Sequence, residues 1–154
     1  MAKRTVRRAR DGTFQVRLTD EERDLVASLT AQLRELLLSD QPDGVERLFP
    51  PGYANDEERQ TEYQLITHDE LLEKRLASVD VVEQTVTKTS LTEEELGAWM
   101  GAVNDLRLVL GTRLDVTEEM ERVAVDDPRA PALAVYQYLT YLLSEIVQAL
   151  SDTL

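Results

Sequence analysis

The side chains best suited to chemistry are one arginine and two carboxylates on neighbouring predicted helices. Arg107 falls at the centre of the apolar stripe of a helix predicted over 91–114. Glu62 and Asp69 fall on or near the leucine-bearing face of the preceding predicted helix. Because an arginine stays charged in any protein setting, a buried Arg107 requires a carboxylate partner. We therefore expect Arg107 to pair with Glu62 and Asp69, with Arg113 as a further candidate.

This predicted cluster has two interpretations. The first is structural: a buried ion pair that fixes the register of the two helices, in which the loss of one partner costs about 3–5 kcal/mol. The second is functional: a polar pocket for a small anionic ligand, or an active site built from Arg107, Asp69 and Glu62. We favour the structural interpretation, because no nucleotide, phosphate or hydrolase motif accompanies these residues.

Cysteine and histidine usage narrows the possible chemistry further. The chain has no cysteine, which excludes disulfides, cysteine-based zinc sites and thiol nucleophiles within these residues. Its one histidine is His68. A carboxylate-bridged metal site in a helical bundle requires Glu-x-x-His pairs, and the residue three positions before His68 is Leu65. We therefore expect no bound metal, no cofactor and no enzymatic activity.

The amino-terminal residues alternate in a way that is typical of a β-hairpin. The stretch TVRRARDGTFQVRL is split by Asp11-Gly12, a dipeptide that suits a tight two-residue turn. This pattern predicts a hairpin over about 4–18. A lone hairpin is marginally stable in water, so it must pack on the helices or on a partner. The side chains expected on its buried face are Phe14, Val16 and Leu18.

The predicted hairpin is basic, although the chain as a whole is acidic. Six basic residues and one acid in 1–17 give a local charge of +5, which leaves −18 for the remainder of a chain whose net charge is −13. Such a balance opposes broad contact with nucleic acid or an anionic membrane. Charges on an edge strand usually protect it from aggregation. The alternative is a small contact with DNA or an acidic partner, made by Arg4, Arg7, Arg8 and Arg10.

Helices are predicted for most of the remaining chain. Two capping boxes, Thr19 to Glu22 and Thr92 to Glu95, open the first and third helices. The second helix is expected to begin near residue 55 and to extend as far as residue 86, with a bend or an interruption somewhere inside. On the third helix, Gly97 and Gly101 form a strip where another backbone could approach closely. The fold class predicted is mainly α, a bundle of four to five helices.

The last predicted helix, at about 130–151, is apolar nearly all round. Such a helix lies at the centre of its bundle, or one of its sides faces a second subunit. We expect a homodimer through this helix. We also expect one domain over 1–154, with the basic hairpin at 1–18 and the helical bundle at 19–154.

Membrane insertion and secretion are not predicted. No apolar run approaches the roughly 18 residues that a membrane span requires. The basic amino terminus lacks the apolar region of a secretory signal. We therefore expect a cytoplasmic location.

Three runs of the sequence resemble an actinobacterial family that is catalogued as a domain of unknown function. They are FPPGYANDEERQTEYQLITHDELLEKRLA, NDLRLVLGTRLDV and YQYLTYLLSEIVQAL, and the resemblance extends over nearly the whole chain. One branch of this family is described as AosR-like oxidative-stress transcription regulators. Its genes are often found beside that of the Clp-protease adaptor ClpS.

The resemblance implies a helical, non-enzymatic protein that acts through other proteins. Its leading implication is a regulatory protein–protein interaction module connected with transcription or stress. The alternative is an accessory factor of Clp-type proteolysis. The regulator branch is associated with a cysteine pair that acts as a redox switch, and thiol sensing does not carry over because this chain has no cysteine.

Overall fold

The computed structural model describes residues 4–39, 57–114 and 126–152, with side chains in the second range described from residue 69 onward. These residues form four helices and three short strands. The helices are α1 (Asp20–Leu38), α2 (Glu57–Thr85), α3 (Glu93–Leu114) and α4 (Ala130–Ser151), and the strands are β1 (Val6–Arg8), β2 (Phe14–Val16) and β3 (Ser90–Leu91). The predicted class, mainly α with an amino-terminal hairpin, is confirmed.

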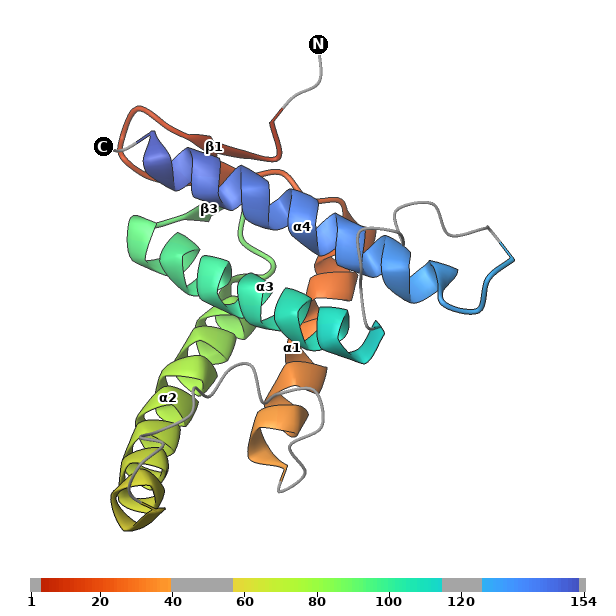
Figure 1. The fold of residues 1–154 in the computed structure, drawn as a ribbon. Helices are drawn as coiled ribbons and strands as arrows, with labels where there is room; N and C mark the ends of the chain where they lie inside the picture. Colours follow the sequence, from red (N-terminus) through yellow and green to blue (C-terminus); the bar gives the residue numbers. More distant parts are fainter. Residues whose placement is uncertain (1–3, 40–56, 115–125, 153–154) are drawn as a thin grey trace.

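The helices are arranged around α3. Figure 1 shows α3 and α4 lying side by side, with α1 and α2 extending away from this pair, and the small sheet near the end of α4. Helix α2 is continuous from Glu57 to Thr85, so the interruption predicted within it was wrong. No helix in the described ranges combines the length and apolarity needed to cross a membrane.

Both predicted capping boxes are confirmed. The Thr19 hydroxyl accepts a hydrogen bond from the Glu22 backbone N–H, and the Glu22 carboxylate accepts one from the Thr19 N–H, each at 3.1 Å. The same reciprocal pair joins Thr92 and Glu95, at 2.9 and 3.1 Å. These bonds satisfy N–H groups that the first turn of a helix leaves without partners, so the local sequence sets where α1 and α3 begin.

The hairpin forms, but its turn differs from the one predicted. Strands β1 and β2 are antiparallel, with Val6 opposite Val16. The Ala9 N–H donates to the Thr13 carbonyl at 2.7 Å, and the Gly12 N–H donates to the Ala9 carbonyl at 3.2 Å. The loop therefore contains three residues, 10–12, and Gly12 adopts a φ of +88°. A type I turn followed by a glycine in the left-handed region is a common three-residue hairpin loop, so the two-residue turn was wrong.

A third strand completes the sheet. Ser90 and Leu91 form β3, which pairs antiparallel with β2 and places Leu91 opposite Phe14. The strand order is β1-β2-β3. Two residues are too few for a periodic signal, so the sequence pattern did not predict this strand. It connects the hairpin to the start of α3.

The core confirms the predicted buried face of the hairpin. Phe14, Val16 and Leu18 are at most 9% exposed, and they belong to one cluster with the inner faces of the helices. The single tryptophan, Trp99, is 1% exposed. Its indole N–H donates to the Thr85 hydroxyl at 2.7 Å, which satisfies the polar end of a buried aromatic side chain.

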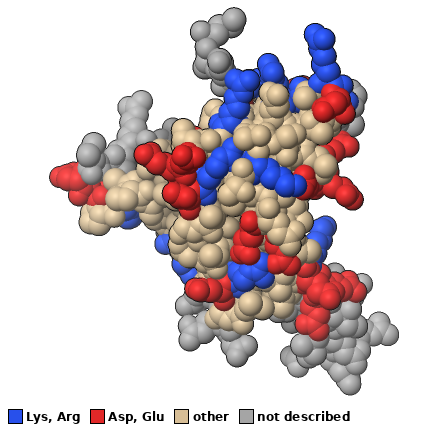
Figure 2. All heavy atoms as spheres, turned by 180° about the vertical axis from the view of Figure 1, so that it is seen from behind, with Lys and Arg blue, Asp and Glu red and all other residues tan. Residues whose placement is uncertain are grey.

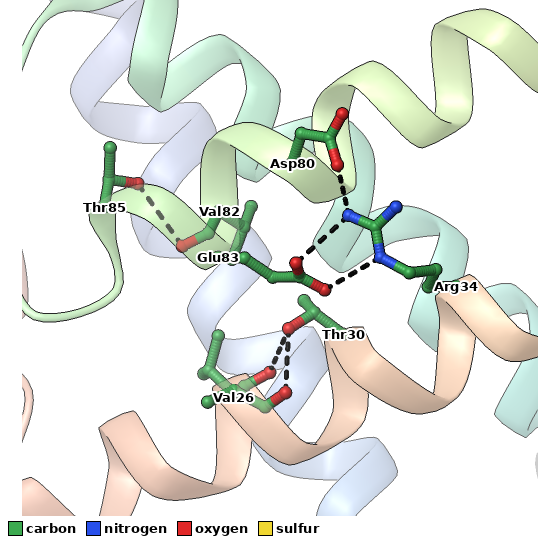
Figure 3. A network of polar contacts seen from close by, with 8 residues as sticks. Val26, Thr30, Arg34, Asp80, Val82, Glu83 and Thr85 are labelled. Carbon is green, nitrogen blue, oxygen red and sulfur yellow. Dashed lines mark hydrogen bonds and ion pairs between the residues drawn. The ribbon is translucent and has the colours of Figure 1, made fainter.

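An exposed ion-pair network joins α1 to α2. Figure 3 shows Arg34 reaching from α1 toward Asp80 and Glu83 on α2. The Arg34 Nη2 and Nε atoms donate to the two carboxylate oxygens of Glu83 at 3.0 and 3.2 Å. The two-pronged geometry fixes orientation, although solvent access limits the contribution of such pairs to about 1 kcal/mol or less.

The close approach between helices occurs at a different glycine from those predicted. A Cβ atom added to Gly97 would meet nothing within 4 Å, and one added to Gly101 would lie 3.5 Å from the Ser78 hydroxyl. A Cβ atom added to Gly111 would lie 3.1 Å from the Tyr136 ring on α4. The tight contact is therefore between Gly111 and α4.

Candidate functional site

Arg107 connects α3 to α4. Its Nε atom donates to the Thr140 hydroxyl at 3.0 Å, and its guanidinium carbon lies 5.4 Å from the centre of the Tyr136 ring. The side chain is half-buried. A guanidinium stacked on an aromatic face gains about 0.5–1 kcal/mol at such an exposed site. The described contacts of Arg107 are thus with α4, where an aromatic face and a hydroxyl replace the expected carboxylate.

The other residues predicted for this cluster lie elsewhere. Asp69 is exposed on α2, and Arg113 is exposed in the last turn of α3. Glu62 belongs to α2, but its side chain lies outside the described side chains. The structure does not bring Arg107 to Asp69, because α3 contacts α2 on one side and α4 on the other. A helical wheel places Arg107 on the broad apolar side without distinguishing these two neighbours.

The α2–α3 interface does contain a buried ion pair, made by other residues with the charges reversed. Arg75 of α2 donates from Nη1 to Oδ1 of Asp105 on α3 at 2.7 Å. The Asp105 side chain is 1% exposed and that of Arg75 is 25% exposed. The sequence carried one signal for this pair: Asp105 is the single acid between Leu96 and Leu110.

Burial dominates the electrostatics of Asp105. Desolvation raises the pKa of its carboxyl to about 6, although the neighbouring Arg75 acts to lower that pKa. Its Oδ2 atom is buried and makes no hydrogen bond to the described residues. Among the described side chains, one carboxylate oxygen of Asp105 therefore has no hydrogen-bond partner, which makes the charged form of Asp105 costly.

The segment NDLRLVLGTRL of α3 thus contains the residues that bind α3 to α2 and to α4. Asp105 binds α2, and Arg107 and Gly111 contact α4. The Thr112 hydroxyl donates to the Leu108 carbonyl at 2.9 Å within α3 itself. These contacts account for Asp105, Arg107, Gly111 and Thr112 of this segment by packing and hydrogen bonding.

Two of the four predicted hairpin arginines contact the end of α4. Arg4 forms an ion pair with the Asp152 carboxylate at 3.2 Å, and Arg8 donates to the Asp152 backbone carbonyl at 3.5 Å. Cationic groups are stabilised at a helix carboxyl terminus, where carbonyl groups lack partners within the helix. Arg4 and Arg8 therefore have an intramolecular role.

The other two arginines face outward. Arg7 donates to the Gln15 amide oxygen across the hairpin at 3.2 Å, and Arg10 is exposed in the turn. Figure 2 shows Lys and Arg side chains gathered toward the upper edge of the molecule, where the hairpin lies, above a body on which acidic groups are spread. The basic hairpin surface is thus smaller than the sequence indicated.

The hairpin is also bound to α4 by neutral and acidic groups. The Thr5 N–H donates to the Glu145 carboxylate at 2.7 Å, and the Thr5 and Tyr141 hydroxyl groups share a hydrogen bond of 2.8 Å. On the same flank of α4, Tyr138 donates to the Glu22 carboxylate of α1 at 2.7 Å. One flank of α4 is therefore covered by the hairpin and α1.

The outward face of α4 carries no charged residue. Its inner face is buried, as in Leu139, Leu142 and Ile146. The exposed residues that face outward are Ala134, Gln137, Thr140, Tyr141, Ser144, Val147, Gln148 and Ser151, and we call them the α4 face. Two of them are large: the Tyr141 side chain is 48% exposed and that of Val147 is 44% exposed.

One residue of α3 extends the α4 face. Contacts of Gly111 with Tyr136 and of Arg107 with Thr140 show that α3 and α4 are antiparallel. Met100 lies two turns before Arg107, and Val147 lies two turns after Thr140, so both lie toward the same end of this helix pair. Met100 is 37% exposed. In the described parts of the chain, no three His, Cys, Asp or Glu side chains gather as metal ligands.

Comparison with known sequences identifies the class of protein to which this fold belongs. A family model described as "Domain of unknown function (DUF2017)" matches residues 3–150, so the chain belongs to this family. The family resemblance noted in the sequence is thereby confirmed. No solved structure matches the chain.

The chain is similar to mycobacterial proteins that are named as regulators. It is 32% identical over 114 residues to "Oxidative stress regulator AosR" of Mycobacterium tuberculosis and of Mycobacterium bovis, covering 71% of this chain and 52% of those proteins. It is 40% identical over 76 residues to "Putative oxidative stress regulator AosR" of Mycobacterium leprae, covering 49% of this chain and 35% of that protein. The chain spans about half the length of the curated relatives it matches.

Proposed function

We propose that this chain is a non-enzymatic regulatory module that acts by binding protein partners, one of which is a second copy of itself. The names of its relatives support a regulatory role. The contacts of the charged groups of α3 support a structural role for them, since Arg75 binds Asp105 and Arg107 packs against Thr140 and Tyr136 of α4.

The observation that carries the proposal is the α4 face. Charged residues make up 31% of the chain, yet the eight exposed residues of this face include none. Depletion of charge and the presence of Tyr and Met are typical of the centre of a protein–protein interface. The face extends along α4 for about 26 Å, from a rise of 1.5 Å per residue.

A second copy of the chain suits this face. Two molecules of net charge −13 repel each other, so their contact is most favourable where both surfaces lack acidic groups. A two-fold axis brings the same patch together from both copies, and a helix with small and neutral side chains allows such self-complementary packing. Val147 then provides apolar area within the contact, and Tyr141 provides it at the edge beside the hairpin.

The regulatory role can be tested in the native host. We expect a strain that lacks this gene to show an altered transcript response to hydrogen peroxide, and the wild-type gene to restore it. Val147→Glu places a buried, unpaired charge in the proposed contact and is expected to abolish restoration. Thr87→Glu introduces the same charge at an exposed residue outside the α4 face and is expected to restore the response.

Two outcomes would contradict this proposal. An unaltered transcript response in the deletion strain would remove the regulatory role. Full restoration by Val147→Glu, at protein levels equal to the wild type, would show that the α4 face is dispensable for that role.

A further inference from the structure

The outer face of the sheet contains a pocket. It has a volume of about 470 Å³ and lies along β2, between the hairpin turn, β3 and the start of α1. The side chains of Thr13, Gln15 and Arg17 alternate with the buried residues of this strand and therefore point outward. Ser90 lines the pocket from β3, and Arg23 lines it from α1.

Arg23 supplies a fixed positive charge at one end of this pocket. Its Nη1 atom donates to the Val86 and Lys88 carbonyls at 2.6 and 2.9 Å, and its Nη2 atom donates to the Val16 carbonyl at 3.1 Å. These three bonds hold the guanidinium in place through backbone carbonyls, and the nearby Glu22 carboxylate acts on the Arg23 charge only through space, since its hydrogen bonds are to Thr19 and Tyr138. Among the described residues, neither Arg23 nor Arg17 forms an ion pair.

The one acidic residue in the pocket lining is already bound. The Asp11 carboxylate accepts hydrogen bonds from the Thr13 backbone N–H at 3.0 Å and from the Thr13 hydroxyl at 2.6 Å. These bonds hold the pKa of Asp11 below its ordinary value. Asp11 lies in the turn, so it does not neutralise the two arginines where β2 continues into α1.

We propose that this sheet pocket binds an acidic segment of a partner protein, with one carboxylate seated between Arg17 and Arg23. The Gln15 amide and the Ser90 hydroxyl supply further hydrogen-bonding groups along the sheet for a segment in extended conformation. This site is separate from the α4 face and does not depend on self-association.

Charge favours a short acidic peptide over nucleic acid. Exposed charges interact over about 10 Å at 0.1 M salt, so a short segment held at the pocket is attracted by Arg17 and Arg23, which line it, and is opposed mainly by the acidic first turn of α1. A long nucleic acid would also extend over the rest of the chain, whose net charge of −18 repels its phosphates. The positive region is therefore suited to a short segment.

Fluorescence anisotropy of a labelled Glu-rich peptide tests this site on the full chain. We expect the peptide to bind, and a labelled Lys-rich peptide of the same length not to bind. Arg17→Gln removes a side chain that lines the pocket and should weaken peptide binding by about tenfold, the loss of one charge-assisted contact. Arg10→Gln removes the same charge from the same hairpin outside the pocket and should change the affinity little.

Several results would overturn the proposal. Equal weakening by Arg17→Gln and Arg10→Gln would indicate a diffuse electrostatic effect without a site. The absence of peptide binding at low salt would exclude the site, and tight binding of a labelled single-stranded DNA without peptide binding would assign the surface to nucleic acid. Val147→Glu should leave peptide binding unchanged, so failure of this site and failure of the α4 contact are measured separately.

Discussion

At the scale of single residues, Asp105 combines almost complete burial with an incomplete set of partners. Arg75 occupies one carboxylate oxygen, and the other is buried without a described hydrogen bond. Removal of a carboxylate from water costs several kcal/mol, and one partner restores part of that cost. Because part of this cost remains, burial favours the protonated form of Asp105 and raises its pKa to about 6.

This preference predicts a pH dependence of stability. An aspartate in the unfolded chain has a pKa near 3.9, and Asp105 in the folded chain has a raised pKa of about 6. The folded state therefore binds this proton more tightly, so the stability it contributes is present below about pH 4 and is lost as pH rises through about 6. The free energy of unfolding of the wild type should fall between about pH 5 and pH 7.5 relative to that of Asp105→Asn.

The comparison between the two proteins isolates this one group, because all other carboxylates titrate in both. Thermal or urea unfolding at the two pH values gives the required differences. The same pH dependence in the wild type and in Asp105→Asn would show that burial does not raise the pKa of Asp105.

A double-mutant cycle measures the ion pair itself. Arg75→Met leaves the Asp105 charge buried without its partner and should lower the free energy of unfolding by about 3–5 kcal/mol. Arg75→Met combined with Asp105→Leu removes both charges and should recover a large part of this loss. A double mutant whose loss equals the sum of the two single losses would show that the two residues do not interact.

The sequence predicted that an arginine and a carboxylate would meet between the second and third helices, but it did not predict which ones. Helix α3 packs against both α2 and α4, so the apolar stripe on its helical wheel is broad. Arg107 falls at the centre of this stripe, and the wheel does not show which of the two helices it faces. In the structure Arg107 faces α4, where Tyr136 and Thr140 bind it. The prediction assigned the arginine to α3 and the carboxylates to α2, whereas the structure has the reverse arrangement, with Arg75 on α2 and Asp105 on α3.

At the scale of helices and strands, local sequence patterns predicted the starts of two helices and the hairpin. They did not predict contacts between segments that are distant in the sequence. The capping boxes at Thr19 and Thr92 act through residues three positions apart, so the sequence contains all the information needed. Strand β3 forms only because β2 is present beside it. The contacts of Arg4 and Arg8 with the end of α4 depend on the tertiary fold in the same way.

Replacing Gly97 or Gly111 of α3 by alanine is expected to change the free energy of unfolding in different ways. Gly97→Ala adds a methyl group that meets nothing within 4 Å, and replacing a helical glycine by alanine should raise the free energy of unfolding by about 0.5–1 kcal/mol. Gly111→Ala places the methyl group 3.1 Å from the Tyr136 ring, so it should gain less or become destabilising.

Urea unfolding of the two variants beside the wild type checks this pair, since both carry the same substitution in the same helix. Equal stabilisation by both substitutions would mean that α4 does not approach α3 closely at Gly111.

At the scale of the whole molecule, charge is distributed in three regions. The body is acidic and several of its charges are bound in pairs such as Arg75 with Asp105 and Arg34 with Glu83. The hairpin is basic, and two of its four predicted contact residues, Arg4 and Arg8, bind the end of α4. The α4 face is uncharged, which the sequence indicated only in part, because an apolar helix predicts burial without showing which side stays exposed.

The mass of the protein in solution shows whether the chain associates with a second copy of itself through the α4 face. Static light scattering after size exclusion, over a range of concentrations, should give twice the mass of one chain for the wild type and for the control Thr87→Glu. Val147→Glu should give the mass of one chain at the same concentrations, with an unchanged circular dichroism spectrum. A wild type that stays at the mass of one chain at every concentration, or a Val147→Glu variant that remains double, would contradict self-association through the α4 face.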